Sequence, residues 1–403
     1  MVDRTIWRAL ALAAALGTAT AAHAQTSVKI GILTDMSSLY SDLSGQGSAL
    51  AARMAAEDFG AEKKGIKVEF VSADHQNKPD VGTTVARQWL DVDKVDVIVD
   101  VPNSAVALAV NGVVKEKNKV LLVSGAATAD LTGKACTPNT VHWTYDTWAL
   151  ANGTGNAIIK TGGDTWFFLT ADYAFGHALE RDTEAVVLAA GGKVLGKVRH
   201  PLNSSDFSSY LLQAQSSKAK IIGLANAGGD TTNSIKQAAE FGIVAGGQNL
   251  AGLLVFITDV HALGLKTAQG LIFTETFYWD QNEQTRAFAK RFAPQFKGVH
   301  PTMVHAGVYS AVTHYLKAIE ALKDASDGAK VVAKMKEMPT DDPLFGKGSI
   351  RADGRKIHPA YLVEVKKPEE SKGPWDYHKV RATIPAEEAF RPMDKGDCPL
   401  VKK

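Results

Sequence analysis

The stretch from Val28 to Phe59, VKIGILTDMSSLYSDLSGQGSALAARMAAEDF, decides how the chain is expected to fold. It opens with an apolar run that predicts a buried strand at 27–33, followed by a polar loop that contains glycine. Residues 46–59 then carry a helical period, with apolar side chains on one face at Leu50, Met54 and Phe59. A strand, a loop and a helix in this order form the first unit of an α/β fold.

The same alternation continues along the chain. Further strands are predicted at 67–73, 95–99 and 120–123, with helices at 79–90 and 104–117 between them. A second run of the same kind starts near Gly162, with strands at 165–169, 193–199, 221–225, 250–256 and 271–277. Strands connected through helices form parallel sheets covered on both faces. The two runs therefore predict two doubly wound α/β lobes, and the glycine-containing stretch 143–163 joins them.

The rest of the chain does not predict a third lobe. Its elements are expected to complete the first two by crossing back between them. These elements are helices at 283–296, 302–323 and 329–338, a hairpin of 344–350 with 360–366 around Asp353-Gly354, and a charged surface tail from Pro368 onward.

The composition excludes several classes of protein. The 403 residues include 45 basic and 43 acidic side chains, for a formal net charge of +2, so the surplus of cations that binds nucleic acid is missing. A hydrophobic content of 45% is too high for a disordered chain. With only two cysteines, the chain is neither a disulfide-rich small protein nor a zinc-cluster protein.

The N-terminus predicts export. Arg4 and Arg8 precede an apolar run, Ala9–Ala22, and Ala22-His23-Ala24 has the small residues of a signal-peptidase site. The run is shorter than the roughly 20 residues of a membrane-spanning helix, although an N-terminal membrane or amphipathic helix is the alternative. We expect residues 1–24 to be a signal peptide and the mature, soluble protein to work in the periplasm.

The sequence lacks the usual enzyme motifs. It has no G-x-S-x-G elbow, no H-E-x-x-H pair and no Walker loop. Gly153-Thr154-Gly155 lacks the third glycine of a dinucleotide fingerprint, and His300 and His305 do not have the spacing of metal ligands. No catalytic residue, cofactor or metal is predicted.

Loops at the carboxyl ends of the first lobe's strands form the candidate ligand site, because open parallel sheets bind ligands there. Small and hydroxyl residues gather in three of these loops, at Ser37–Tyr40, Pro102–Ser104 and Ser124–Thr128. N–H groups at a helix start favour an anion such as a carboxylate. The alternative is structural, since Ser104 and Thr128 are also suited to helix capping.

The second lobe presents different side chains at its strand ends. Tyr173 and Phe175 follow its first strand, Asn226 its third and Phe256 its fourth. These aromatic residues are expected to contact an apolar ligand body. The aromatic run 273–279 is read equally well as a buried strand or as pocket lining.

Four segments together carry a family resemblance. They are the opening stretch 28–59, LLVSGAATADLTG at 121–133, FLTADYAFGHAL at 168–179 and IKQAAEFG at 235–242. The mature chain resembles type I periplasmic solute-binding proteins of the branch that serves branched-chain amino acid ABC transporters. The resemblance implies two lobes joined by three crossovers. The lobes are expected to close around a ligand in the cleft between them.

The resemblance also implies roles for residues. Asn103, Ser104, Ala126 and Thr128 are expected to hold the ligand carboxylate, and Tyr173 or Phe175 to close over it. Members that bind α-amino acids often place a carboxylate on the ligand's ammonium, but the corresponding stretch here, 253–258, is apolar. The full predicted set of ligand-binding residues is Ser38, Tyr40, Asn103, Ser104, Ala126, Thr128, Tyr173, Phe175, Asn226 and Phe256.

The predicted ligand is an apolar or branched-chain amino acid or a related carboxylate, with an aromatic acid, an amide or a urea-like solute as the alternative. Asp172, Asp230 and Glu275 are the carboxylates available to an ammonium, with no choice among them. The expected partner is a membrane permease of an ABC transporter, with no nucleic acid, and the chain is expected to be a monomer. A sensory module and a periplasmic enzyme are the competing functions.

Domain boundaries and a disulfide complete the predictions. The first lobe is expected to comprise 28–147 and 279–345, the second 148–278 and 346–385, and the tail 386–403. Crossings are expected near 145–150, 276–280 and 343–348. Cys136 and Cys398 are predicted to form a disulfide, because an exported chain with two cysteines commonly pairs them. Two unpaired thiols are the alternative.

Overall fold

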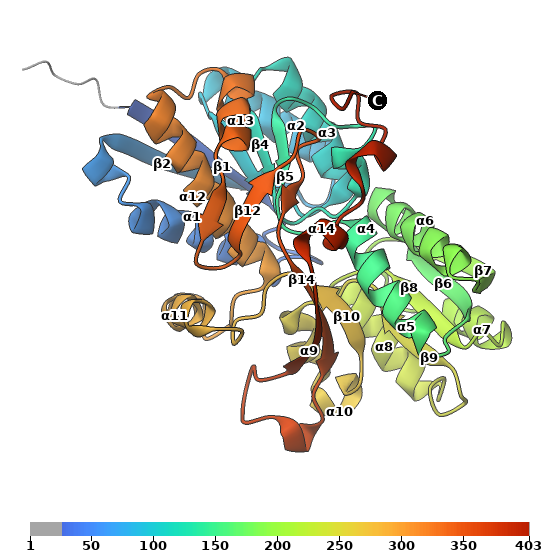
Figure 1. Cartoon of the computed structure of the whole chain (residues 1–403). Helices are drawn as coiled ribbons and strands as arrows, with labels where there is room; N and C mark the ends of the chain where they lie inside the picture. The colour runs from blue at the N-terminus through green and yellow to red at the C-terminus, as the bar shows by residue number, and fades with distance from the viewer. Residues whose placement is uncertain (1–25, 403) are drawn as a thin grey trace, which may run out of the picture.

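The computed structural model describes residues 26–402, and the expected signal peptide lies outside them. The chain forms two α/β lobes, one at the top of Figure 1 and one at the lower right. The first lobe contains a parallel sheet in the order β2-β1-β3-β4-β5. Its strands are β1 Thr26–Thr34, β2 Ile66–Asp74, β3 Val97–Asp100, β4 Val120–Val123 and β5 Thr140–His142.

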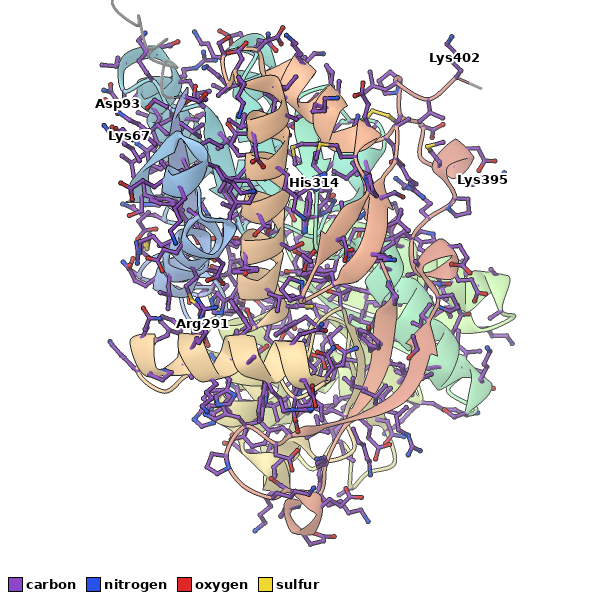
Figure 2. The ribbon with its side chains drawn as sticks, turned by 60° about the vertical axis from the view of Figure 1, so that its left-hand side comes forward. Lys67, Asp93, Arg291, His314, Lys395 and Lys402 are labelled. Atoms are coloured by element: carbon purple, nitrogen blue, oxygen red, sulfur yellow. A yellow bond between two sulfur atoms is a disulfide. The ribbon has the colours of Figure 1, made fainter. Side chains whose placement is uncertain are left out.

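Helices cover both faces of this sheet, which explains why β3 and β4 are buried along their whole length. The predicted opening unit is confirmed, with the helix α1 directly after the first loop. In Figure 2 the long helix α12, with His314 labelled, stands upright, and α11, with Arg291, lies across its lower end. The main helices are α1 Gly45–Phe59, α2 Pro79–Arg87, α3 Ser104–Glu116, α11 Glu283–Phe292, α12 Met303–Leu322 and α13 Gly328–Glu337.

The second lobe repeats the architecture with a parallel sheet in the order β7-β6-β8-β9. Its strands are β6 Thr165–Ala171, β7 Lys193–His200, β8 Ile221–Ala225 and β9 Asn249–Gly252. Its helices are α4 Thr147–Leu150, α5 Asn156–Lys160, α6 Ala174–Ala189, α7 Ser208–Ser216, α8 Gly229–Glu240, α9 Ile257–Leu263 and α10 Leu265–Ala268. The predicted strand at 250–256 ends early, at Gly252, and Phe256 is the N-cap of α9.

The expected strand at 271–277 forms a separate antiparallel sheet. β10 (Ile272–Glu275) pairs with β14 (Ala360–Val365), which pairs with β15 (His378–Ile384). The predicted hairpin of 344–350 with 360–366 is wrong, because the turn at Asp353-Gly354 is tight enough to fold the chain back at once. There β12 (Gly346–Ile350) pairs with β11 (Thr340–Asp342) and β13 (Lys356–Ile357).

This pairing changes the expected lobe boundary. A bridge between His142 and Arg355 joins the β11-β12-β13 sheet to β5, so residues 346–357 pack with the first lobe. The sequence had placed them in the second lobe. The chain therefore crosses between β13 and β14, at 357–360, and not near 343–348.

The C-terminal segment returns to the first lobe after β15. Its α14 (Ala386–Ala389) lies between the lobes in Figure 1, and the labelled Lys395 and Lys402 lie beside the upper lobe in Figure 2. The predicted disulfide between Cys136 and Cys398 is confirmed and joins residues 262 positions apart. Within the described residues the lobes are thus joined by four connections: near 145–150 and 276–280 as predicted, at 357–360, and through this segment after β15. Within residues 26–402, no helix is long and apolar enough to cross a membrane.

Candidate functional site

A small hollow lies where the two lobes meet. Its walls come from loops that follow β1, β3, β4 and β5 in the first lobe, and β6, β8 and β9 in the second. This is the position that parallel sheets offer to ligands. The lining residues are Tyr40, Leu43, Pro102, Gly125, Ala127 and Tyr145 from the first lobe, and Tyr173, Phe175, Ala227, Leu254 and Phe256 from the second.

Close backbone packing holds the first lobe's loops together at the hollow. A Cβ atom at Gly125 would lie 2.7 Å from the Cα of Pro102, so a larger residue there would push the two loops apart. The Tyr145 hydroxyl donates to the carbonyl of Gly125 at 2.6 Å. Thr128 N–H donates to the hydroxyl of Ser104 at 3.2 Å, which ties the second loop to the start of α3.

Asp100 lies beneath these loops and is fully buried. Its carboxylate accepts a hydrogen bond from the Thr34 hydroxyl at 2.8 Å. Burial raises the pKa of Asp100 to about 7, because the charged form loses its hydration. Asp100 therefore places a carboxyl that is partly neutral at pH 7 behind the loop Gly125–Thr128.

The second lobe contributes an aromatic wall. The rings of Tyr173 and Phe175 lie 5.9 Å apart, and Phe256 meets Tyr145 of the opposite lobe edge to face at 6.1 Å. Such ring pairs are stabilising beyond the area they bury. The second lobe therefore offers an apolar surface to whatever the hollow holds.

The lobes contact one another across the hollow. The hydroxyls of Tyr40 and Tyr173 are hydrogen-bonded at 2.6 Å, and burial raises the pKa of both phenols, so both stay protonated at neutral pH. Gly228, with φ of 57°, brings its backbone against Leu39 so closely that a Cβ atom would lie 2.7 Å from the Leu39 carbonyl oxygen. The structure is therefore a closed arrangement of the two lobes.

No charged side chain lines the hollow in the described residues. Asp230 is buried nearby, but it accepts N–H groups of Asn203 and Ser204 at 3.0 and 2.8 Å. Burial raises the pKa of Asp230 to about 6. Glu275 pairs with His378 at 2.9 Å, and Asp172 pairs with His177 at 2.8 Å. The three carboxylates considered for a ligand ammonium thus lie outside the lining.

The predicted site residues fall into three groups. Tyr40, Tyr173, Phe175 and Phe256 line the hollow. Four others lie in the adjoining loops, where Gly125, Ala127 and Pro102 are the lining residues; these four are Asn103, Ser104, Ala126 and Thr128. Asn103 caps α3 by accepting N–H groups from residues 105 and 106, and Thr128 caps the next short helix, so the structural alternative also holds for both.

Ser38 and Asn226 lie farther out. The Ser38 hydroxyl donates to Asp35 at a wider opening between the lobes that Ser38 helps to line. The Asn226 amide donates to His200 or Ser234 and accepts from Thr231, all within the second lobe. Both side chains therefore have partners inside the protein.

Several lining residues were not predicted. Gly125 and Ala127 alternate with predicted positions in the quoted segment 121–133, so the segment was recognised although the residues facing the hollow were not. Tyr145 was read as part of the join between lobes. Its aromatic ring beside Trp143 was the available signal. The others are Leu43, Pro102, Ala227 and Leu254, which the sequence does not distinguish from core residues.

The described residues contain no group of three His, Cys, Asp or Glu side chains placed to hold a metal ion. The lining itself consists of apolar groups, backbone and three phenols. Such a surface is suited to binding a small apolar solute between the lobes.

The family model of periplasmic binding proteins matches residues 27–374. The chain belongs to this family. This periplasmic binding protein is 55% identical to one from Burkholderia mallei, with a TM-score of 0.91 over 94% of this chain and 100% of that one. It is 41% identical to a branched-chain amino acid ABC transporter periplasmic ligand-binding protein from Burkholderia xenovorans, with a TM-score of 0.82 over 93% and 99% of the two chains.

A sequence relative supports the same assignment. A Leu/Ile/Val-binding protein homologue from Brucella melitensis is 28% identical over 65% of this chain and 67% of its own length. The two-lobed α/β fold and the solute-binding role within an ABC transport system are thus those of the family. The family to which this periplasmic binding protein belongs consists of solute-binding proteins.

Proposed function

We propose that the chain captures a small carboxylic acid with an apolar or aromatic body and delivers it to the permease of an ABC transporter. The observation that carries this proposal is the composition of the hollow. Backbone and phenols from the first lobe meet a wall from the second that is apolar apart from the Tyr173 hydroxyl, and no acidic side chain lines the space.

The carboxylate is expected at the first lobe. There the loop Gly125–Thr128 meets the start of α3, where the Thr128 N–H donates to the Ser104 hydroxyl and Asn103 accepts the N–H groups of residues 105 and 106. A helix start carries partial positive charge, so it stabilises an anion without a full cation. The apolar body would then contact Tyr173, Phe175 and Phe256, which bury much area while losing little rotamer entropy.

The lining favours an acid without an ammonium group. An ammonium enclosed here would be desolvated without a carboxylate partner, which costs several kcal/mol. Aromatic acids and apolar aliphatic acids meet this condition. A branched-chain amino acid is the second candidate, because the relative from Burkholderia xenovorans is described as a branched-chain amino acid transport protein.

A ligand panel tests the proposal. Thermal shift followed by calorimetry would compare benzoate, 4-methylpentanoate, leucine and the matched amides, because ligand binding raises apparent stability by mass action. We expect the acids to bind more tightly than their amides, and acids without an ammonium more tightly than leucine. Tighter binding of leucine than of 4-methylpentanoate would reverse the order of the two candidates, and binding of none of the acids would contradict the proposal.

A pair of variants locates the site. Ala227→Trp fills the hollow from the second lobe and is expected to abolish binding, while Ala245→Trp adds the same bulk at an exposed position. Circular dichroism establishes that both variants fold. Equal binding by the two variants would place the ligand elsewhere.

The proposal includes export to the periplasm with cleavage after Ala24. N-terminal sequencing of the protein recovered from the periplasm is expected to begin at Gln25. A protein that retains residues 1–24 would contradict this part.

A further inference from the structure

The C-terminal segment 386–401, called the tail here, packs against the part of the first lobe that follows the ligand-facing loop. That part is the short helix η3 (Ala129–Thr132) and the turn after it. The disulfide from Cys398 reaches Cys136 in that turn. The tail and the loop are also in direct backbone contact, since a Cβ atom at Gly133 would lie 2.6 Å from the carbonyl oxygen of Gly396.

Arg391 makes the polar contact between the tail and this region. Its guanidinium Nη2 donates to the carbonyl of Ala129 at 3.0 Å, where the Thr132 hydroxyl also donates at 3.4 Å. The backbone carbonyl of Arg391 in turn accepts from the Arg351 guanidinium at 2.8 Å. Arg391 is thus held at its backbone while its side chain holds η3, two residues beyond the lining residue Ala127.

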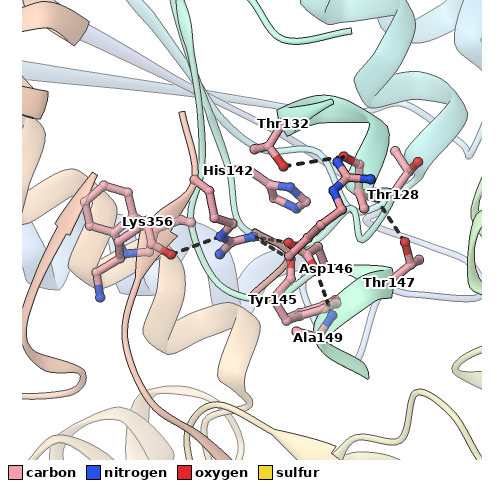
Figure 3. A network of polar contacts seen from close by, with 12 residues as sticks. Thr128, Thr132, His142, Tyr145, Asp146, Thr147, Ala149 and Lys356 are labelled. Carbon is pink, nitrogen blue, oxygen red and sulfur yellow. Dashed lines mark hydrogen bonds and ion pairs between the residues drawn. The ribbon is translucent and has the colours of Figure 1, made fainter. Parts of the chain in front are cut away.

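The tail also covers the group that fixes Tyr145. Phe390 is buried, and the guanidinium carbon of Arg355 lies 4.3 Å from the centre of its ring. Arg355 donates to the Tyr145 carbonyl at 3.0 Å and approaches the Asp146 carboxylate at 3.4 Å. Figure 3 shows these bonds, with Tyr145, Asp146 and the backbone of Lys356 gathered around one guanidinium.

The same short helix faces the second lobe. Asp130 of η3 forms an ion pair with Arg181 of α6 at 3.3 Å. Ala129 N–H donates to the Thr147 hydroxyl at 3.1 Å, and that hydroxyl donates to Asp182 of α6 at 2.6 Å. A change in the position of η3 therefore reaches both the ligand-facing loop and the contact between the closed lobes.

We propose that Arg391 is a positioning residue for ligand binding, held in place by the disulfide-anchored tail. It touches no lining residue. It acts by fixing η3, and with it the backbone N–H groups of Gly125–Thr128 and the Asp130–Arg181 contact. The expected effect of Arg391 on ligand affinity rests on the proposed function. Its expected effect on the structure of η3 does not require a ligand.

The experiment compares three full-length variants. Arg391→Ala removes the donor to Ala129, Arg391→Lys keeps a cation on a long side chain, and Lys395→Ala changes an exposed residue of the same tail. With benzoate or leucine as the probe, whichever the wild type binds, Arg391→Ala is expected to weaken binding about tenfold, because hydrogen bonds to charged groups are among the stronger ones. The Arg391→Lys variant is expected to bind more tightly than Arg391→Ala but more weakly than the wild type. The control Lys395→Ala is expected to bind as tightly as the wild type.

Hydrogen exchange supplies the readout that a general loss of stability would not give. In Arg391→Ala, without ligand, amides of 125–133 are expected to exchange faster while β1 and α12 keep their protection. Wild-type exchange at 125–133 would overturn the proposal, as would loss of protection spread evenly over the first lobe. Unchanged affinity in Arg391→Ala would overturn it as well. If no probe binds the wild type, the proposed function fails while the exchange data still decide the role of Arg391.

Discussion

The two lobes share the same α/β fold, but they line the hollow with different kinds of groups. Beside the side chains of Tyr40, Leu43 and Tyr145, the first lobe brings backbone close to the hollow at 102, 125 and 127. A disulfide and a buried arginine hold the segments that follow these loops. The second lobe presents Phe175, Phe256 and other apolar side chains, and has no disulfide among the described residues.

This difference separates two tasks. A charged ligand group needs fixed hydrogen-bond donors, and fixed donors require a rigid backbone. An apolar ligand body needs only area and shape, which large side chains supply from a lobe that moves. We therefore expect changes in the first lobe to act mainly on stability and on the polar end, and changes in the second to act on the apolar end and on closure.

The largest expected effect comes from removing the disulfide. Changing Cys136 and Cys398 together to serine releases a constraint over 262 positions, and the chain-entropy relation gives an upper figure of about 5 kcal/mol for so long a loop. The urea midpoint is expected to fall, with hydrogen exchange rising first in the first lobe. An unchanged urea midpoint would show that the stability of the first lobe does not depend on the disulfide.

Phe256→Ala tests the apolar lobe. Phe256 is 2% exposed, and truncating a buried phenylalanine destabilises by about 3–5 kcal/mol. We also expect weaker binding of acids with a bulky body, whereas acetate, which has little apolar surface, should lose less. Phe256→Leu is the matched control, since it keeps most of the volume. An equal loss of affinity for bulky acids and for acetate would contradict the assignment of the apolar end of the ligand to the second lobe.

Asp100→Asn tests the buried carboxyl of the first lobe. Unfolded Asp100 ionises near its usual pKa of 3.8 and the folded residue near 7, so between these values the folded protein holds a proton that the unfolded chain lacks. Its contribution to stability therefore falls as pH rises through this window, by about 1.4 kcal/mol per pH unit. The Asp100→Asn variant lacks this loss of stability with rising pH. Asparagine also tolerates the φ of 83° that the backbone adopts at position 100.

The measurement is the difference in unfolding free energy between wild type and Asp100→Asn from pH 4 to pH 7. Asp230→Asn is the second-lobe counterpart, and its window should close near pH 6, because burial raises the pKa of Asp230 only to about 6. A difference curve for Asp100→Asn that is flat with pH would contradict the buried, partly neutral carboxyl.

Tyr173→Phe is expected to have the smallest effect. It removes the 2.6 Å hydrogen bond to Tyr40 that joins the lobes, which contributes about 1 kcal/mol. Small-angle scattering with and without ligand should show a smaller fraction of closed molecules, with Tyr210→Phe, inside the second lobe, as the control. Identical profiles for wild type and Tyr173→Phe would show that the phenol pair does not stabilise closure.

The alternation of strands and helices predicted both lobes, because each strand carries its own apolar pattern and each connection is short. The hairpin of 344–350 failed for a physical reason. β12 reads GKGSI and has almost no apolar pattern of its own, so only tertiary pairing decides that it joins β11 while β14 joins β10. A single sequence does not reveal which of several compatible strands will pair.

The candidate site shows the same limit of sequence reasoning. Tyr40, Tyr173, Phe175 and Phe256, which line the hollow, were predicted as ligand-binding residues because large aromatic residues after strands are conspicuous. In the segment around Gly125 every residue is small, and which of them faces the hollow depends on how tightly the loop folds against Pro102. The contact of Arg391 with Ala129 joins positions too far apart in the chain for local patterns to indicate.

The disulfide can form only after the second lobe has been synthesised, because that lobe lies between the two cysteines in the sequence. Synthesis from the N-terminus delivers Cys136 long before Cys398, and the whole second lobe lies between them. The first lobe therefore becomes covalently locked only after the second lobe and Cys398 have been synthesised. Because the chain has only two cysteines, oxidation within one molecule has a single product, so maturation requires an oxidant but no reshuffling of mispaired bonds.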